Sequence, residues 1–416
     1  MRSSQHDPQT TAAETGTTFE RVPDNPIPVL IYLPGLGRSA KNTADTVADM
    51  IAKSLDLRDS AHRFTAEASH DVVTPTGLTA SKTVLGPDRK PVLQLFQLDY
   101  RAALEESPTA FAPSVGPGAI KAGFLALQGI LWWVGALRRP AKTARTKLQL
   151  VLGLSCALAL VVAALVAFVA LLTTLGLQVG WLDKTFGAED KVAAWTLGIS
   201  SLGLTITWAK LRKDLLALAL LTESLIRFAK NEDVLADTIT RRLDHAVNDL
   251  TDGHWIGPIH LLGYSFGSLA TYEAMFPRTT SLVGVVPAQS IDTMVTIGCP
   301  LDLVRLYAPE YVDGRAARNP GLAWTNVFNQ ADVFASNLKD GDDTGAGAAD
   351  VVPTGGAGAA DDIATGRAPE SVRYLDQEIA VRHLLLTGHI HAGYWTDASK
   401  ASCFDRLVGI WVPATA

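Results

Sequence analysis

The sequence predicts an α/β fold, built on a mainly parallel sheet with helices on both faces and interrupted by a helical membrane insertion. Three observations lead to this prediction. Short apolar runs alternate with amphipathic stretches near both ends of the chain, a pattern typical of parallel sheets. The stretch from Leu148 to Leu182 contains no charged residue and is too long and too apolar for an ordinary soluble core. Finally, the segment Gly263-Tyr264-Ser265-Phe266-Gly267 directly follows a short apolar run.

The N-terminal part of the chain is expected to supply one half of the sheet domain. Residues 1–25 are polar and have no apolar core, so we expect a disordered N-terminal segment and no cleavable signal peptide. Residues 26–118 form the first half of the domain. Its expected elements are a buried strand at Pro28–Leu33, a turn at Pro34–Gly37, a helix at Asn42–Leu57 and a hairpin with arms at Ser81–Leu85 and Val92–Leu98.

Residues 119–214 are expected to form the membrane insertion, which has three apolar windows. The second and third windows, at about 150–176 and 192–209, approach or exceed the roughly 20 apolar residues of a spanning helix. Buried core helices are the alternative for these two. The first window, at about 122–137, is short and carries Trp132 and Trp133 near its basic end. It is balanced between a span and an interfacial helix, and we place it in the interface.

The topology of the insertion follows from the sheet and from charge. If strands before and after the insertion share one sheet, both halves lie on one side of the membrane, and the number of crossings is even. Two crossings satisfy this condition. Basic residues precede the second window and follow the third, whereas the loop at Asp183–Lys191 has no such excess. By the positive-inside tendency, we expect an integral protein of the cell (plasma) membrane with its sheet domain in the cytoplasm.

The second half of the sheet domain is expected at residues 215–416. Its expected elements are a helix at Asn231–Leu250, a strand at Ile259–Leu262, a helix at Ser268–Met275, strands at Val295–Gly298 and Trp324–Phe328, an extended segment at Val372–Val381 and a closing helix within Ser399–Ile410. The segment 338–369 is rich in Gly, Ala and Asp without periodicity, so we expect a mobile loop.

The segment around Ser265 has the form of a nucleophile elbow. A serine hydroxyl becomes a strong nucleophile only when a base takes its proton and a rigid turn exposes it. Gly263 and Gly267 relieve crowding where the strand turns sharply into a helix, so we predict Ser265 as the nucleophile. The oxyanion of acyl transfer needs two backbone N–H donors, which we predict to be those of Phe266 and Leu36.

The base and the acid are predicted from their order along the chain. The base is expected to be a histidine late in the chain, and the acid to follow a strand between nucleophile and base. His391, in a loop after a strand-like run of leucines, is the preferred base, and His389 is the alternative. Asp332, just beyond the predicted strand Trp324–Phe328, is the preferred acid. The alternative acid is Asp302, which also suits a helix cap or a turn.

In residue type and chain order, these segments resemble the α/β-hydrolase superfamily. The segments Gly298–Asp302 and His391–Trp395 are similar to those of lipase-like and esterase-like members. The chain departs from the family at Pro34-Gly35, where the oxyanion turn usually reads His-Gly. The resemblance implies an α/β-hydrolase fold with 26–118 and 215–416 as its two halves. It also implies cleavage of an ester, thioester or amide through an acyl-enzyme, without selecting a substrate. Among these we expect a carboxylic ester, cleaved by a Ser-His-Asp triad.

Composition narrows the expected partners. The net charge of −6 and the absence of long Lys/Arg runs argue against nucleic acid. Cys156, Cys299 and Cys403 lack metal-type spacing, and neither an HExxH segment nor a phosphate-binding glycine loop occurs, so we expect no metal and no cofactor. The expected partners are the bilayer and an acyl ester drawn from or near it. The alternatives are a catalytically silent membrane-anchored scaffold of the same fold and an acyltransferase that uses the same triad.

Overall fold

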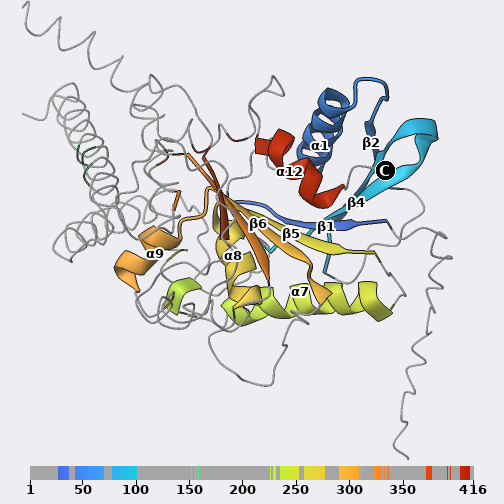
Figure 1. Ribbon diagram of the computed structural model, residues 1–416. Coiled ribbons are helices and arrows are strands. Elements are labelled where there is room, and N and C mark those ends of the chain that lie inside the picture. Colours follow the sequence, from blue (N-terminus) through green and yellow to red (C-terminus); the bar gives the residue numbers. More distant parts are fainter. Residues whose placement is uncertain are drawn as a thin grey trace, which may run out of the picture.

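The structure is a computed structural model, and it describes residues 27–36, 43–69, 77–100, 151, 155, 158, 225, 228–230, 235–252, 257–276, 290–308, 311, 322–329, 332, 335–336, 372–376, 391, 394 and 403–412. These residues form an α/β fold whose centre is one mixed, mostly parallel sheet of eight strands. Figure 1 shows this sheet with helices on both of its faces. The coarse prediction of fold class is therefore confirmed.

The sheet is antiparallel at one end and parallel elsewhere. Its strands are β1 (Val29–Leu33), β2 (Thr65–Ala68), β3 (Ala80–Leu85), β4 (Pro91–Gln97), β5 (Ile259–Tyr264), β6 (Thr293–Ile297), β7 (Ala323–Phe328) and β8 (Val372–Asp376). Their order across the sheet is β2-β3-β4-β1-β5-β6-β7-β8. The β2–β3 and β3–β4 pairs are antiparallel, and all pairs from β4 to β8 are parallel. The carboxyl ends of the parallel strands therefore meet at one edge, where open α/β sheets bind ligands.

Two hydrophobic clusters hold helices against the two faces. The helices α1 (Ala44–Arg58) and α12 (Cys403–Trp411) share one cluster with Leu30 and Tyr32 of β1. The helices α7 (Leu235–Asp252) and α8 (Phe266–Met275) share the other with Val29, Ile31 and Leu33. Figure 1 shows the two helix pairs on opposite sides of the sheet. Alternate side chains of a strand point to opposite faces, so β1 is buried on both.

The sheet joins the two halves of the chain directly. The strand β1, which precedes residues 101–224, pairs in parallel with β5, which follows them. In this register Leu33 lies opposite Gly263, so the turn after β1 lies beside the segment around Ser265. The condition for an even number of membrane crossings, namely one sheet containing strands from both halves, is therefore met.

The described elements confirm most of the predicted ones, with shifted ends. The strand at 259–262 continues through Tyr264, and α8 begins at Phe266 instead of Ser268, so Ser265 alone makes the turn between them. The hairpin forms as β3 and β4, joined through a short 3₁₀ turn at Pro87–Arg89. Two elements were not predicted from the sequence, the edge strand β2 and the short helix α9 (Leu301–Tyr307).

The predicted membrane windows and several other segments lie almost wholly outside the described residues. These segments are the N-terminal stretch 1–25, the windows at 122–137 and 192–209, the loop 338–369 and His389. Within the window at 150–176 only Val151, Ser155 and Leu158 are described, and all three are helical and exposed. Among the residues that the structure describes, no helix has the length and apolarity required to cross a membrane.

Candidate active site

Ser265 occupies the sharp turn between β5 and α8. Its backbone has φ 54° and ψ −121°, a conformation that side-chain-bearing residues rarely adopt. A hydrogen bond to β6 holds this turn, since the Ser265 N–H donates to the carbonyl of Ile297 at 2.8 Å. Strain of this kind costs about 1 to 3 kcal/mol and persists only where the surrounding structure enforces it. The elbow geometry predicted around Ser265 is thus present.

The two glycines of the elbow permit close backbone contacts. A Cβ atom at Gly263 would lie 2.6 Å from the Cα atom of Ser268, which follows in the first turn of α8. At Gly267 it would lie 2.0 Å from the carbonyl oxygen of Leu33, at the end of β1. Neither approach tolerates a side chain, since the obstructing atoms belong to the backbone. The first turn of α8 therefore packs directly against the carboxyl end of β1.

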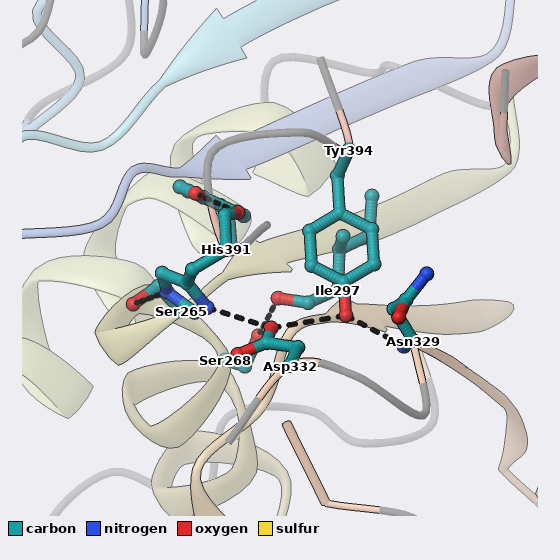
Figure 2. Close-up of polar contacts among 8 residues, drawn as sticks. Ser265, Ser268, Ile297, Asn329, Asp332, His391 and Tyr394 are labelled. Atoms are coloured by element: carbon teal, nitrogen blue, oxygen red, sulfur yellow. Dashed lines mark hydrogen bonds and ion pairs between the residues drawn. The ribbon is translucent and has the colours of Figure 1, made fainter. Parts of the chain in front are cut away.

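His391 lies between Ser265 and Asp332, as Figure 2 shows. Its Nε2 atom is 2.8 Å from the Ser265 Oγ atom, and its Nδ1 atom is 2.8 Å from Asp332 Oδ2. Because an ionised carboxylate only accepts hydrogen bonds, Nδ1 carries the proton and Nε2 is left to accept the hydroxyl proton of Ser265. Asp332 is fully buried, whereas 17% of the His391 side chain is exposed.

Contacts from β5 and β6 orient the His391 ring. The hydroxyl of Tyr264 donates to the His391 carbonyl at 2.7 Å, and the two rings stack with centroids 5.4 Å apart. On another side lies Gly298, which has φ +60°. A Cβ atom there would be 3.1 Å from His391 Cε1. A residue with a side chain would therefore be unfavourable at position 298, because the backbone there is left-handed and the imidazole lies close to it.

Tyr394 is a further member of the site that the sequence analysis did not single out. Its hydroxyl donates to Asp332 Oδ2 at 3.1 Å and accepts the Asn329 N–H at 2.7 Å. Figure 2 shows the ring beside the carboxylate. Burial, and then the charge of Asp332, raise the pKa of Tyr394 well above its ordinary value of 10, so it remains a donor. In the sequence it resembles an ordinary core aromatic, because its partner Asp332 lies 62 residues away.

The segment that carries Asp332 is fastened to the ends of β6 and β7. The Asn326 side chain accepts from the Thr296 hydroxyl and donates to the Ser336 carbonyl, each at 2.8 Å. The Ser336 N–H in turn donates to the Cys299 carbonyl at 2.7 Å. All four residues are buried, where a satisfied hydrogen-bond network specifies one arrangement. The network therefore fixes Ser336, four residues after Asp332, to Asn326 of β7 and to Cys299 beyond β6.

The alternative acid has a different position. Asp302 lies in the first turn of α9, and its backbone N–H donates to the Ser336 hydroxyl at 2.5 Å. A negative charge is favourable there because the N-terminus of a helix carries partial positive charge. The hydrogen bond from Nδ1 of His391 goes instead to Asp332. The structure thus brings Asp332 to the histidine, while the alternative base, His389, lies outside the described residues.

The two predicted oxyanion donors belong to segments that meet at Ser265. Phe266 is the first residue of α8, and Leu36 follows β1 in the turn that begins with Pro34. A Cβ atom at Gly35 would lie 3.2 Å from the Ser265 Cβ atom, so this turn passes directly beside the nucleophile. The backbone amides of Leu36 and Phe266 therefore lie in the two segments that flank the Ser265 side chain.

Two cysteines lie close to this site: Cys299 directly follows Gly298, and the Cys403 thiol donates to the Tyr394 carbonyl at 3.8 Å. No group of three or more His, Cys, Asp or Glu side chains is placed to hold a metal ion within the described ranges. Cys299 and Cys403 are buried and free. Desolvation raises the pKa of the Cys403 thiol to about 12 and that of Cys299 further still, so both remain protonated and weakly nucleophilic.

No protein-family model matches the chain, and comparisons with curated proteins and with solved structures found no match.

Proposed function

We propose that this chain is a membrane-anchored serine hydrolase with an α/β-hydrolase fold, which cleaves a carboxylic ester through an acyl-enzyme intermediate. The observation that carries the proposal is the arrangement of Ser265, His391 and Asp332, joined by two contacts of 2.8 Å at a strained strand-to-helix turn. The chain order of nucleophile, acid and base, together with the parallel sheet, supports assignment to that fold.

In the first half of the reaction, the Ser265 hydroxyl attacks the ester carbonyl carbon. His391 Nε2 takes the hydroxyl proton as the bond between Oγ and carbon forms. The imidazolium produced is stabilised by the Asp332 carboxylate, which accepts the hydrogen bond from Nδ1. The N–H groups of Phe266 and Leu36 are proposed to bind the oxyanion of the tetrahedral intermediate. Collapse of the intermediate breaks the ester C–O bond, and His391 returns the proton to the departing alcohol.

The second half of the reaction restores the enzyme. Water gives a proton to His391 Nε2 while its oxygen attacks the acyl carbon bound to Ser265. The second tetrahedral intermediate has its oxyanion in the same place. It collapses to a free carboxylic acid, and Ser265 regains its proton from the imidazolium. Water is the only acyl acceptor that hydrolysis requires.

The membrane anchor is the second part of the proposal. The windows at about 150–176 and 192–209 are proposed to cross the bilayer, with about 122–137 in the interface. The pairing of β1 with β5 supports an even number of crossings, because both strands must lie on one side. Val151 and Leu158, in the longest window, expose 48% and 55% of their surfaces, as side chains facing lipid would. The basic flanks favour a cytoplasmic catalytic domain in the cell membrane.

The proposed substrate is a hydrophobic acyl ester drawn from or near the bilayer. This part of the proposal follows from the membrane windows, since the catalytic domain would be held close to the lipid surface. It is tested by measuring kcat/KM of the purified protein on p-nitrophenyl esters of increasing acyl length. We expect the value to rise with chain length. A strict preference for acetate over longer acyl chains would contradict it.

The hydrolase proposal is tested with a fluorophosphonate probe, which reacts covalently with activated serines. Membrane fractions containing the wild type, Ser265→Ala or His391→Ala are labelled under the same conditions. We expect labelling of the wild type and none of either variant, with all three proteins folded and present in the membrane fraction. A folded wild-type protein that takes no label would favour the scaffold function over the hydrolase.

A further inference from the structure

Two aromatic side chains from distant parts of the chain pack against the ring of Phe266. Tyr100 stacks on it with ring centroids 5.7 Å apart and an interplanar angle of 26°. Phe228 meets it edge-on, with centroids 5.1 Å apart and an angle of 65°. All three rings are fully buried. Contacts of this type are worth about 0.5 to 1.5 kcal/mol beyond the burial of area, and they restrict the ring to one orientation.

Tyr100 also contacts the turn after β1. Its hydroxyl donates to the carbonyl oxygen of Pro34, across a sequence separation of 66 residues. That carbonyl belongs to the peptide unit that enters Gly35, which lies against Ser265. A peptide unit is planar, so a hydrogen bond to its carbonyl fixes the orientation of the whole unit. The Pro34–Gly35 peptide in turn sets the direction in which the chain runs on to Leu36. Tyr100 therefore contacts both segments that carry the expected oxyanion donors.

We propose that Tyr100 and Phe228 are positioning residues for the oxyanion hole, an inference that rests on the hydrolase function proposed above. Tyr100 holds the Pro34 peptide with its hydroxyl and the start of α8 with its ring. Phe228 holds Phe266 from a second direction. Backbone donors stabilise the transition state only if their N–H groups already point at the developing charge. The aromatic contacts supply this orientation without contacting the substrate.

Tyr100 and Phe228 lie far apart in the sequence. All three apolar windows lie between Tyr100 and Phe228 in the sequence. The proposed brace of the oxyanion donors thus combines one residue from before the predicted membrane segments with one from after them.

The test uses Tyr100→Phe, which removes the hydroxyl and keeps the ring. The matched control is Tyr311→Phe. Tyr311 belongs to the same aromatic cluster, with its ring 6.2 Å from Phe228, but its hydroxyl bonds the Leu269 carbonyl in α8. The measurements are kcat and KM on p-nitrophenyl butyrate, and the Ki of an alkyl trifluoromethyl ketone, whose serine adduct carries an oxyanion. Activity is expressed per serine labelled by fluorophosphonate, which corrects for unfolded protein.

For Tyr100→Phe we expect kcat to fall about tenfold, less than the roughly 100-fold loss on removing a donor itself. KM should stay within about twofold, and the Ki should rise in parallel with the loss of kcat. Tyr311→Phe should match the wild type in all three. Phe228→Leu, which keeps the apolar volume, should show a smaller change in the same direction as Tyr100→Phe.

Two results would overturn the inference. One is a Tyr100→Phe enzyme with the kcat and Ki of the Tyr311→Phe control. The other is a loss of kcat with an unchanged Ki, because a purely structural role would not discriminate the oxyanion adduct. Wild-type protein that is neither labelled nor active would instead reject the hydrolase function, and the positioning role with it.

Discussion

The two sides of Ser265 are built from different interactions. On one side, the relay side, polar side chains hold one another in a chain of hydrogen bonds. On the other, the oxyanion side, close backbone packing and stacked rings hold two peptide segments. The relay side consists of His391, Asp332 and Tyr394, and the oxyanion side of Leu36, Phe266, Tyr100 and Phe228.

This difference predicts different responses to substitution. Each group of the relay side has one chemical task, and removing it leaves a buried partner without its hydrogen bond. The oxyanion side spreads its support over several contacts, so single changes should shift the donors and not remove them. Substitutions of His391 and Asp332 are therefore expected to cause the largest losses of activity, and oxyanion-side substitutions graded ones.

The largest effect is expected from His391→Ala, which removes the base. Without it the Ser265 hydroxyl keeps its proton, so kcat on p-nitrophenyl butyrate should fall by roughly 10⁴-fold to 10⁶-fold. The matched variant is His389→Ala, which removes the competing imidazole two positions earlier. It should retain activity within about threefold of the wild type. The opposite ranking of the two variants would move the base to His389.

The next largest effect is expected from Asp332→Asn, at roughly 10⁴-fold in kcat. An amide at this position cannot stabilise the imidazolium as a carboxylate does, and it can present an N–H that favours the wrong imidazole tautomer. Asp302→Asn, the same change at the alternative acid, should cost less than about twofold in kcat because it alters only a charge at a helix terminus. Steady-state kinetics of both variants decide between the two acids, and similar losses would refute the role given to Asp332.

A graded effect is expected on the oxyanion side from Gly35→Ala. The added Cβ would lie 3.2 Å from the Ser265 Cβ atom and 3.1 Å from Tyr264 Cδ1, so the turn must move by a few tenths of an ångström. Displacements of this size should lower kcat about tenfold, since a 1 Å misplacement can cost about 100-fold. The control, Gly409→Ala in α12, meets only the flexible end of the Arg58 side chain and should leave kcat unchanged. Equal activity of both variants would show that the turn does not contribute to catalysis.

The smallest effect on the relay side is expected from Tyr394→Phe. It removes one donor to Asp332 and the acceptor of the Asn329 N–H, but leaves the contact between Asp332 and His391 in place. The expected loss in kcat is about fivefold, the size of one hydrogen bond of about 1 kcal/mol.

The pH dependence of this variant provides a second check. Because burial raises the pKa of Tyr394 well above 10, its hydroxyl stays protonated and donates throughout the neutral and mildly alkaline range. The ratio of wild-type to variant kcat should therefore be constant from about pH 7 to pH 9, as expected for a donor whose pKa is raised above 10. A ratio that changes across this range would mean that the tyrosine ionises there.

The fold was predictable where burial is complete. The strand β1 is buried at all five positions and β5 at all six, so each appears in the sequence as a continuous apolar run or nearly so. The strand β2, with the sequence Thr-Ala-Glu-Ala, is partly exposed at an edge and contains no such run. The helix α9 has only seven residues, too few to show a clear helical period.

The reacting groups of the candidate site could be predicted from the sequence, but the side chains that position them could not. Ser265, Asp332 and His391 could be chosen from the sequence, because the chemistry calls for those residue types and the fold that the chain resembles has them in that order. Tyr394 and Tyr100 resemble ordinary core aromatics in the sequence. Their roles depend on partners that only the fold brings close, since Tyr394 lies 62 residues from Asp332 and Tyr100 lies 66 from Pro34.

The central claim is that Ser265 forms a covalent acyl-enzyme. It is tested most directly by mixing the purified wild-type protein with p-nitrophenyl butyrate, quenching in acid within milliseconds to seconds, and locating any butyryl group by peptide mass spectrometry. We expect a burst of p-nitrophenol and a butyryl group on the peptide that contains Ser265, and neither when the substrate is added to Ser265→Ala. Steady release of p-nitrophenol without an acylated protein, or a butyryl group on another residue, would show that Ser265 is not the nucleophile.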